Sequence, residues 1–233
     1  MIGLIGGTGF ADFPELTDRR KDTASTQWGE VEVLHGRPGG VSVVFACRHG
    51  DPPRFPPHRI NYRALIEAMA ALEVSAIYAV NAVGGIDLDL ELADLVVPDQ
   101  IIDYTWGREH TFFDESIHHI DFTSPFSEYL RERVIAAAPV LSEADVVKPT
   151  GVYGCMQGPR LETAAEIRRM AADGCTVVGM TAMPEAALAR ERDIDYVAVS
   201  VNVNKAAGLD GAAEIDMLGI AAALELGIAR ART

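Results

Sequence analysis

Small polar clusters follow several apolar, strand-like segments of this 233-residue chain. The clusters are Gly6-Gly7-Thr8-Gly9, Arg48-His49-Gly50, Asn81-Ala82-Val83-Gly84-Gly85, Thr181 and Asn204-Lys205. They supply an arginine fork, hydroxyls, amides and glycine-rich backbone N–H groups, all of which can hold an anion or a purine. Ligands of open α/β sheets bind at the carboxyl ends of the strands. The clusters therefore predict one shared site, although they lie far apart in the sequence.

Simpler interpretations exist when each cluster is taken alone. The glycines at 6–9 can serve a tight turn that needs positive φ, and they match neither the G-x-G-x-x-G dinucleotide pattern nor a P-loop. The segment 81–85 can be an ordinary strand-to-loop turn. A lone arginine such as Arg48 most often forms a surface ion pair. The apolar run before Arg48 and the proline-rich loop after it favour a binding site instead.

Metal and hydrolase sites are disfavoured. His110, His118 and His119 lie near acidic residues, but no histidine pair has the i, i+4 spacing of a helical metal site. A solvated or interface loop is the better interpretation of this segment, and we expect no metal. No serine stands in a G-x-S-x-G elbow, which argues against a serine hydrolase.

Composition limits the partners and the compartment. The net charge of −14 argues against nucleic acid as a partner but leaves room for a small anion in a locally positive pocket. The three cysteines are odd in number and fit no zinc pattern, which indicates a reduced, cytoplasmic protein. No signal peptide and no apolar stretch of roughly 20 residues is visible, so we expect no membrane association.

Apolar periodicity predicts alternating strands and helices. Strands are expected at 1–5, 30–35, 41–47, 76–80, 95–102, 175–180 and 196–201, and helices at 61–72, 127–138, 161–173, 184–190 and 213–231. Residues 107–124 are expected to form a long functional loop, and Ser127 is a candidate N-cap. Alternation of this kind predicts an α/β fold: one domain over residues 1–233, with a mostly parallel, twisted central sheet flanked by helices.

The clusters together resemble one family over nearly the whole chain, the trimeric purine nucleoside and methylthioadenosine phosphorylases. The resembling segments are Gly6-Gly7-Thr8-Gly9, Cys47-Arg48-His49-Gly50, Asn81-Ala82-Val83-Gly84-Gly85, Gln157-Gly158-Pro159-Arg160-Leu161-Glu162-Thr163 and Gly179-Met180-Thr181-Ala182-Met183-Pro184-Glu185. The resemblance implies an enzyme that cleaves a nucleoside's glycosidic bond with phosphate. Phosphate is then a co-substrate, no cofactor is needed, and the protein is expected to be a homotrimer.

The resemblance also assigns roles to individual residues. Phosphate binding falls to Thr8, Arg48, His49, Asn81, the backbone N–H of Ala82, and Thr181. Gly179 and Met180 are expected beside the ribose. Leu161 replaces the family's aromatic residue next to the base, which implies weaker stacking. The 107–119 loop, with His110 and Phe112, is the candidate for residues lent to a neighbouring subunit.

Two positions predict a 6-oxopurine base. The 6-amino enzymes of the family carry acidic residues where this chain has Asn204 and Ala206, whereas Asn followed by Lys is typical of the 6-oxopurine enzymes. The chemistry agrees, because a carboxylate at Glu162 can accept the N1–H of hypoxanthine but would face the bare N1 of adenine. Asn204 is also the catalytic candidate, since an amide N–H can stabilise negative charge developing on the purine.

The segment before the last helix predicts the sugar. Purine nucleoside phosphorylases have a histidine there, but this chain has none between 213 and 218. Ile215 and Leu218 are apolar and are expected to receive a methylthio group, although core packing of an amphipathic helix also accounts for them. The combination predicts phosphorolysis of S-methyl-5′-thioinosine to hypoxanthine and 5-methylthioribose 1-phosphate. An inosine/guanosine phosphorylase, a methylthioadenosine phosphorylase and a non-catalytic nucleoside- or phosphate-binding protein remain alternatives.

Overall fold

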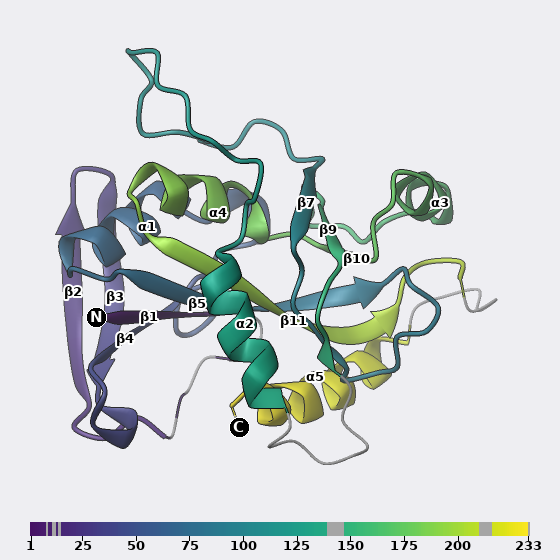
Figure 1. Ribbon diagram of the computed structural model, residues 1–233, viewed down its shortest axis with the longest axis horizontal. Helices are drawn as coiled ribbons and strands as arrows, with labels where there is room; N and C mark the ends of the chain where they lie inside the picture. The colour runs from purple at the N-terminus through teal and green to yellow at the C-terminus, as the bar shows by residue number, and fades with distance from the viewer. Residues whose placement is uncertain (8, 11–12, 14, 139–146, 210–215, 233) are drawn as a thin grey trace.

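A long central strand, β5 (Ala76–Gly85), organises the sheet (Figure 1). The computed structural model describes residues 1–7, 9–10, 13, 15–138, 147–209 and 216–232. These residues form one 11-stranded mixed sheet whose main path is β2-β3-β4-β1-β5-β10-β9-β7, with β11, β6 and β8 branching from it. The strands are β1 (Ile2–Gly6), β2 (Arg20–Thr26), β3 (Gly29–Gly36), β4 (Val43–Cys47), β6 (Leu95–Val96), β7 (Gln100–Asp103), β8 (Val147–Lys148), β9 (Val152–Cys155), β10 (Val177–Gly179) and β11 (Asp195–Lys205).

The two edges of β5 are covered differently. Strand β11 pairs with β5 in parallel along its whole length, from Ala76 to Gly85. The other edge is shared, because β1 pairs in parallel only as far as Ala79 and β10 pairs antiparallel only at Gly84 and Gly85. A gap in strand pairing therefore remains on this edge of β5, between the end of β1 and the start of the β10 pairing.

Helices cover the sheet because alternate strand residues point to opposite faces. In β4, Val44 and Ala46 join the core formed with α1 (Tyr62–Ala71) and α4 (Ala182–Glu191). Val43 and Phe45 join a second core with α5 (Met217–Arg232). Helix α2 (Glu128–Ala137) packs on β11, and α3 (Ala164–Ala172) lies near the ends of β9 and β10 (Figure 1). Two short 3₁₀ turns, Pro38–Gly40 and Pro57–Arg59, complete the described elements.

The α/β fold with a mostly parallel sheet is confirmed, but several element boundaries differ from the predictions. Strands β5 and β11 continue through the polar clusters at 81–85 and 204–205, which therefore belong to strands and not to turns. Helix α3 begins directly after its N-cap Thr163, which forms a capping box with Glu166 in the first turn, so residues 161–162 precede the helix. Ser127 occupies the N-cap position of α2, as predicted, but its side chain makes no capping hydrogen bond. Strands β2 and β9 were not predicted, since β2 is polar and almost fully exposed.

The segment between β7 and α2 projects from the molecule (Figure 1) and is anchored at its base. Glu191 of α4 accepts hydrogen bonds from Thr111 Oγ1 and from the Phe112 N–H. Phe112 packs beneath Arg192, 3.8 Å from guanidinium carbon to ring centre, and is buried in its own chain. This burial removes Phe112 from the candidates for contact with a neighbouring subunit. Ile117 at the tip is 90% exposed. Across the described residues, no helix is long and apolar enough to span a membrane.

Substitution Gly227→Ala tests how closely α5 packs on β11. A Cβ at Gly227 would lie 2.1 Å from Cγ1 of Val201. Helix propensity alone predicts a gain of about 1 kcal/mol for Gly→Ala, but overpacking costs about 1–3 kcal/mol. We expect no gain and a net loss of up to about 2 kcal/mol in the free energy of unfolding, measured with urea.

Ala222→Gly on the exposed side of α5 is the matched control, because it changes propensity without packing. It should destabilise by about 1 kcal/mol. A gain in stability for Gly227→Ala would show that the helix can move away from β11.

Candidate active site

A cavity of about 620 Å³ opens where β1, β4, β5, β10 and β11 end. Nine of the residues predicted from the sequence line it: Arg48, His49, Ala82, Leu161, Glu162, Gly179, Met180, Thr181 and Asn204. Asn81 lies directly behind Thr181. Thr8 and Ile215 fall outside the described residues. The structure thus brings together segments that are separated by up to about 150 residues, while the binding roles themselves stay predictions.

The gap on the edge of β5 faces this cavity. Beyond Ala79 the edge is free of β1, and the Val80 carbonyl accepts a hydrogen bond from Arg48 Nη1 at 2.8 Å. Backbone N–H and C=O groups two residues apart in a strand point to the same edge. The N–H of Ala82 therefore points to the same side as the Val80 carbonyl, where it is available to an anion.

A buried ion pair orients Arg48. Its Nε and Nη2 donate to the two oxygens of Glu185 at 3.0 and 2.7 Å, and Tyr196 Oη donates to the same carboxylate at 2.8 Å. Both side chains of the pair are fully buried. Burial alone would lower the pKa of Arg48, but the Glu185 carboxylate raises it above its ordinary value. The bidentate pair and the bond to Val80 use three of five N–H donors, so two are left for a ligand in the described structure.

The Thr181 hydroxyl is aimed by Asn81. Asn81 Nδ2 donates to Thr181 Oγ1 at 2.7 Å, and both residues are buried. Because that oxygen accepts from the amide, the hydroxyl hydrogen is free to point elsewhere, as an anion in the cavity would require. Asn81 was predicted to bind phosphate itself; here it contacts the predicted ligand residue and lies behind the lining.

His49 is held as one tautomer. Its Nδ1 lies 2.8 Å from the carbonyl oxygen of Phe55, and a carbonyl can only accept, so Nδ1 carries the hydrogen. Burial lowers the pKa of His49, with the Arg48 charge adding to the effect. The neutral ring therefore offers Nε2 as an acceptor, which suits a protonated phosphate oxygen.

The predicted base-reading residues Glu162 and Asn204 line the same cavity. Burial raises the pKa of Glu162. Asn204 Nδ2 donates to the Lys205 carbonyl at 2.8 Å, which leaves one amide N–H and the amide oxygen for a ligand. The Asn204 amide packs over Gly84, where a Cβ would lie 3.3 Å from Nδ2. Glycine at 84 thus makes room for this amide.

Apolar groups line the rest of the cavity. Met180 packs against Gly158, whose φ of +60° and contact of 2.5 Å between a built Cβ and the Met180 sulfur both require glycine. Met217, Ile220 and Leu224 of α5 also line it. Leu218 does not; its side chain is 85% exposed, so the prediction that Leu218 lines this part of the site differs from the structure. Helix rotation, which the sequence pattern left open, places Ile220 and Leu224 inward instead, whereas Met217 lines the cavity and stays 64% exposed.

Two residues of the site were missed by the sequence analysis. Glu185 and Tyr196 form the network around Arg48, although Glu185 ends one of the segments that carry the family resemblance. An acidic residue inside an otherwise buried helix face was the available signal, since a buried carboxylate must have a partner. Among the described residues, no group of three or more His, Cys, Asp or Glu is placed to hold a metal ion.

Comparison with known proteins identifies the family. The model of the phosphorylase superfamily matches residues 1–229, and the chain belongs to this family. A Pseudomonas syringae pv. tomato protein named "Probable S-methyl-5'-thioinosine phosphorylase" is 46% identical over 237 residues, which cover 100% of this chain and 95% of the relative. The 6-oxopurine nucleoside phosphorylase of Pyrococcus furiosus is 44% identical over 218 residues, covering 90% and 81%.

Solved structures agree with this assignment. Methylthioadenosine phosphorylase from Schistosoma mansoni in complex with adenine has a TM-score of 0.93 and 29% identity to this chain, covering 99% of this chain and 88% of that one. The family and the fold class predicted from the sequence are therefore confirmed.

The Arg48–Glu185 pair yields a stability prediction. Substituting Glu185→Gln leaves a buried guanidinium without its countercharge, which costs about 3–5 kcal/mol of unfolding free energy. Tyr196→Phe removes one hydrogen bond to the carboxylate and should cost about 1.5 kcal/mol. Denaturant unfolding of each variant measures both values.

Glu32→Gln serves as the control, because Glu32 pairs with Arg54 at 3.3 Å and both side chains are exposed. Exposed pairs contribute about 0–1 kcal/mol. An effect of Glu185→Gln as small as that of Glu32→Gln would mean that Arg48 finds another partner.

Proposed function

We propose that this protein cleaves S-methyl-5′-thioinosine with phosphate to hypoxanthine and 5-methylthioribose 1-phosphate. The observation that carries the proposal is that one cavity is lined by groups of three kinds. Arg48, Thr181 and Ala82, the predicted phosphate ligands, line it together with Glu162 and Asn204, the predicted base readers. The apolar side chains Met217, Ile220 and Leu224 supply a surface suited to a methylthio group. The closely similar relatives named for this activity support the same substrate.

The geometry supports a dissociative reaction. As the glycosidic bond lengthens, the sugar develops oxocarbenium character and the purine gains negative charge. The free N–H of Asn204 donates to O6 or N7 and stabilises that charge where it develops. Phosphate is already an anion, so the protein has only to hold it beneath C1′. Positioning of this kind can lower the activation barrier by roughly 7–11 kcal/mol. Arg48 and Thr181 hold the phosphate there.

Base selection rests on Glu162 and Asn204. An ionised Glu162 accepts the N1–H of a 6-oxopurine and repels the N1 lone pair of adenine. A buried mismatch of this kind costs roughly 1–3 kcal/mol per group. These residues favour hypoxanthine over adenine, in contrast to the solved relative with adenine bound.

A second candidate is a general 6-oxopurine nucleoside phosphorylase. The Pyrococcus furiosus relative carries that name and is nearly as similar in sequence. This second activity would use the same proposed phosphate- and base-binding residues. The two activities differ in the 5′ substituent of the sugar, which the apolar residues of α5 would contact. A binding protein without catalysis is the candidate from another class.

The reaction as proposed uses inorganic phosphate as co-substrate and needs neither an organic cofactor nor a metal. We propose that the protein works as a homotrimer in the reducing cytoplasm, where its three cysteines would stay reduced. The exposed tip of the projecting loop, with Ile117 and the stacked Phe113–His118 pair, is then the segment offered to a neighbouring subunit.

The proposed activity is tested with methylthioinosine, methylthioadenosine and inosine, each with and without phosphate. We expect phosphate-dependent release of hypoxanthine, fastest from methylthioinosine, measured by chromatography of the free base. Release at the same rate without phosphate would identify a hydrolase. Equal rates for inosine and methylthioinosine would favour the general 6-oxopurine enzyme, and no release from any substrate would favour a binding protein.

Glu162 predicts how the reaction depends on pH. Because burial raises its pKa, the carboxylate is protonated as the pH falls through this raised value and can no longer accept the N1–H. The KM for the 6-oxopurine nucleoside should therefore rise on the acid side. Glu162→Gln should raise the KM at neutral pH roughly tenfold, in line with one lost hydrogen bond to a charged group, and flatten the acid limb.

The exposed Glu132→Gln on α2 should leave the profile unchanged and controls for general charge effects. An acid limb that persists in Glu162→Gln would assign the titration to another group.

A further inference from the structure

Arg108 lies behind the cavity wall, in the segment that leads from β7 into the projecting loop, and is only 9% exposed. Its Nε donates to Gln157 Oε1 at 3.2 Å, and Nη2 donates to the carbonyls of Met156 and Gln157 at 3.2 and 2.8 Å. Nη1 donates to the carbonyls of Met180 and Met183 at 2.9 and 2.5 Å and to Tyr62 Oη at 3.3 Å. Six acceptors thus satisfy all five N–H donors.

This arrangement differs from that of Arg48. In the part of the chain that the structure describes, no carboxylate lies within 4 Å of the Arg108 guanidinium, whereas Arg48 faces Glu185. Burying a charge without a countercharge is costly, and the cost is offset only by complete hydrogen bonding. Neutral backbone carbonyls supply that bonding here. An apolar side chain would fill the same space without the desolvation cost, but it could not donate hydrogen bonds to these carbonyls. The planar set of N–H donors is therefore the property that distinguishes arginine at this position.

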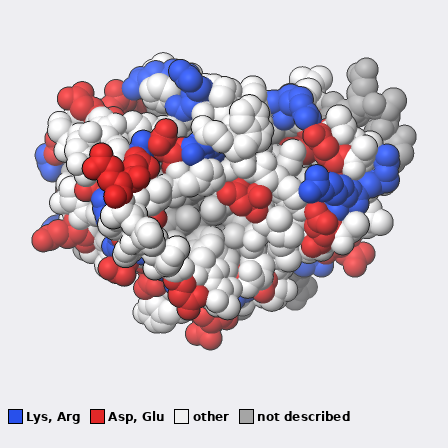
Figure 2. All heavy atoms as spheres, turned by 90° about the horizontal axis from the view of Figure 1, so that it is seen from above, with Lys and Arg blue, Asp and Glu red and all other residues white. Residues whose placement is uncertain are grey.

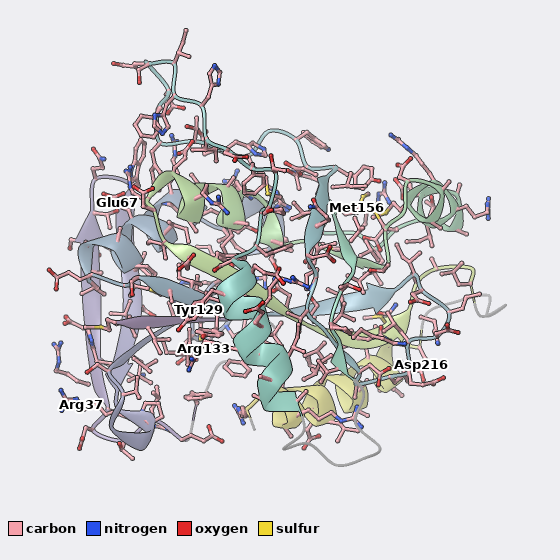
Figure 3. The ribbon with its side chains drawn as sticks, in the orientation of Figure 1. Arg37, Glu67, Tyr129, Arg133, Met156 and Asp216 are labelled. Carbon is pink, nitrogen blue, oxygen red and sulfur yellow. The ribbon has the colours of Figure 1, made fainter. Side chains whose placement is uncertain are left out.

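Five of the six acceptor atoms belong to two segments that each supply lining residues to the cavity. Met156 (Figure 3) and Gln157 directly follow β9 and lead within five residues to Leu161 and Glu162, the residues proposed to meet the base. Met180 and Met183 lie on either side of Thr181, in the turn from β10 into α4 at the phosphate end. A single planar group therefore joins segment 156–162 to turn 180–183.

We propose that Arg108 is a positioning residue that fixes the separation between the base-side segment 156–162 and the phosphate-side turn 180–183. The inference rests on the proposed function, because it assigns the two walls to the two reactants. Phosphate must reach C1′ while the base stays held, and a misplacement of about 1 Å can cost roughly a hundredfold in rate. Lysine keeps the charge but lacks the planar fork, so it cannot join both segments.

The test compares Arg108→Lys with Arg131→Lys. Arg131 is a matched control: it is buried, it donates to the carbonyls of Pro98 and Pro149 and to Glu128, and it does not line the cavity. Amide hydrogen exchange is measured on both variants and on the unsubstituted protein. Rates with methylthioinosine and phosphate are then measured per folded molecule.

For Arg108→Lys we expect faster exchange in both 156–162 and 180–183, and a kcat lower by about a hundredfold while the KM values change much less. Arg131→Lys should lower stability but leave kcat and the exchange of both segments unchanged. Unchanged exchange in the two segments, or a kcat for Arg108→Lys equal to that of Arg131→Lys, would overturn the proposal.

Two further outcomes are distinguishable. If the unsubstituted protein releases no base with phosphate, the proposed function fails, and the exchange data alone decide whether Arg108 holds the two segments. If Arg108→Lys does not fold, Gln157→Leu removes the side-chain oxygen that accepts from Arg108 Nε and from the Trp106 N–H, and it should change exchange and kcat in the same direction. Normal values in Gln157→Leu would then contradict the proposal.

Discussion

The buried ion pair between Arg48 and Glu185 is the contact on which the arrangement of the site depends. It joins the end of β4 to α4, and through Tyr196 and the Val80 carbonyl it also reaches β11 and β5. Removing both charges from water costs several kcal/mol for each ion, so such a pair is weak evidence for stability by itself. Its clear effect is on orientation, because a bidentate pair allows one direction for the guanidinium. Arg48 lines the cavity in this fixed orientation, with two N–H donors not used by the pair or by Val80.

A difference in strand length creates the space that this arginine faces. Strand β5 continues past the end of β1, and the pairing with β10 begins only at Gly84, so backbone groups near Ala82 are left for a ligand. On the other edge, an irregular register between Asn202 and Asn204 shifts β11 and places the Asn204 amide over Gly84. Both ends of the cavity thus depend on departures from regular pairing along one strand.

The charge close to the cavity differs in sign from the net charge of the whole chain. The chain carries a net charge of −14, and the face toward which the loop projects shows acidic and basic side chains among uncharged ones, with an acidic group near its centre (Figure 2). Because Glu185 balances Arg48, the unbalanced positive charge behind the cavity belongs to Arg108. A positive group in a desolvated setting acts on an anion more strongly than one in water. An acidic protein can therefore still present a site suited to phosphate.

Local sequence patterns determined the α/β class, most element positions and the strand-end residues such as Arg48 and Asn204. They could do so because the apolar period sets which side of a strand or helix is buried, and strand ends of a parallel sheet meet at one edge. Only the tertiary structure decided that Glu185, 137 residues away, is the partner of Arg48, and that Asn81 acts on Thr181. It also turned Leu218 outward. These outcomes depend on strand register, strand length and helix rotation, which packing between distant segments sets and no local pattern encodes.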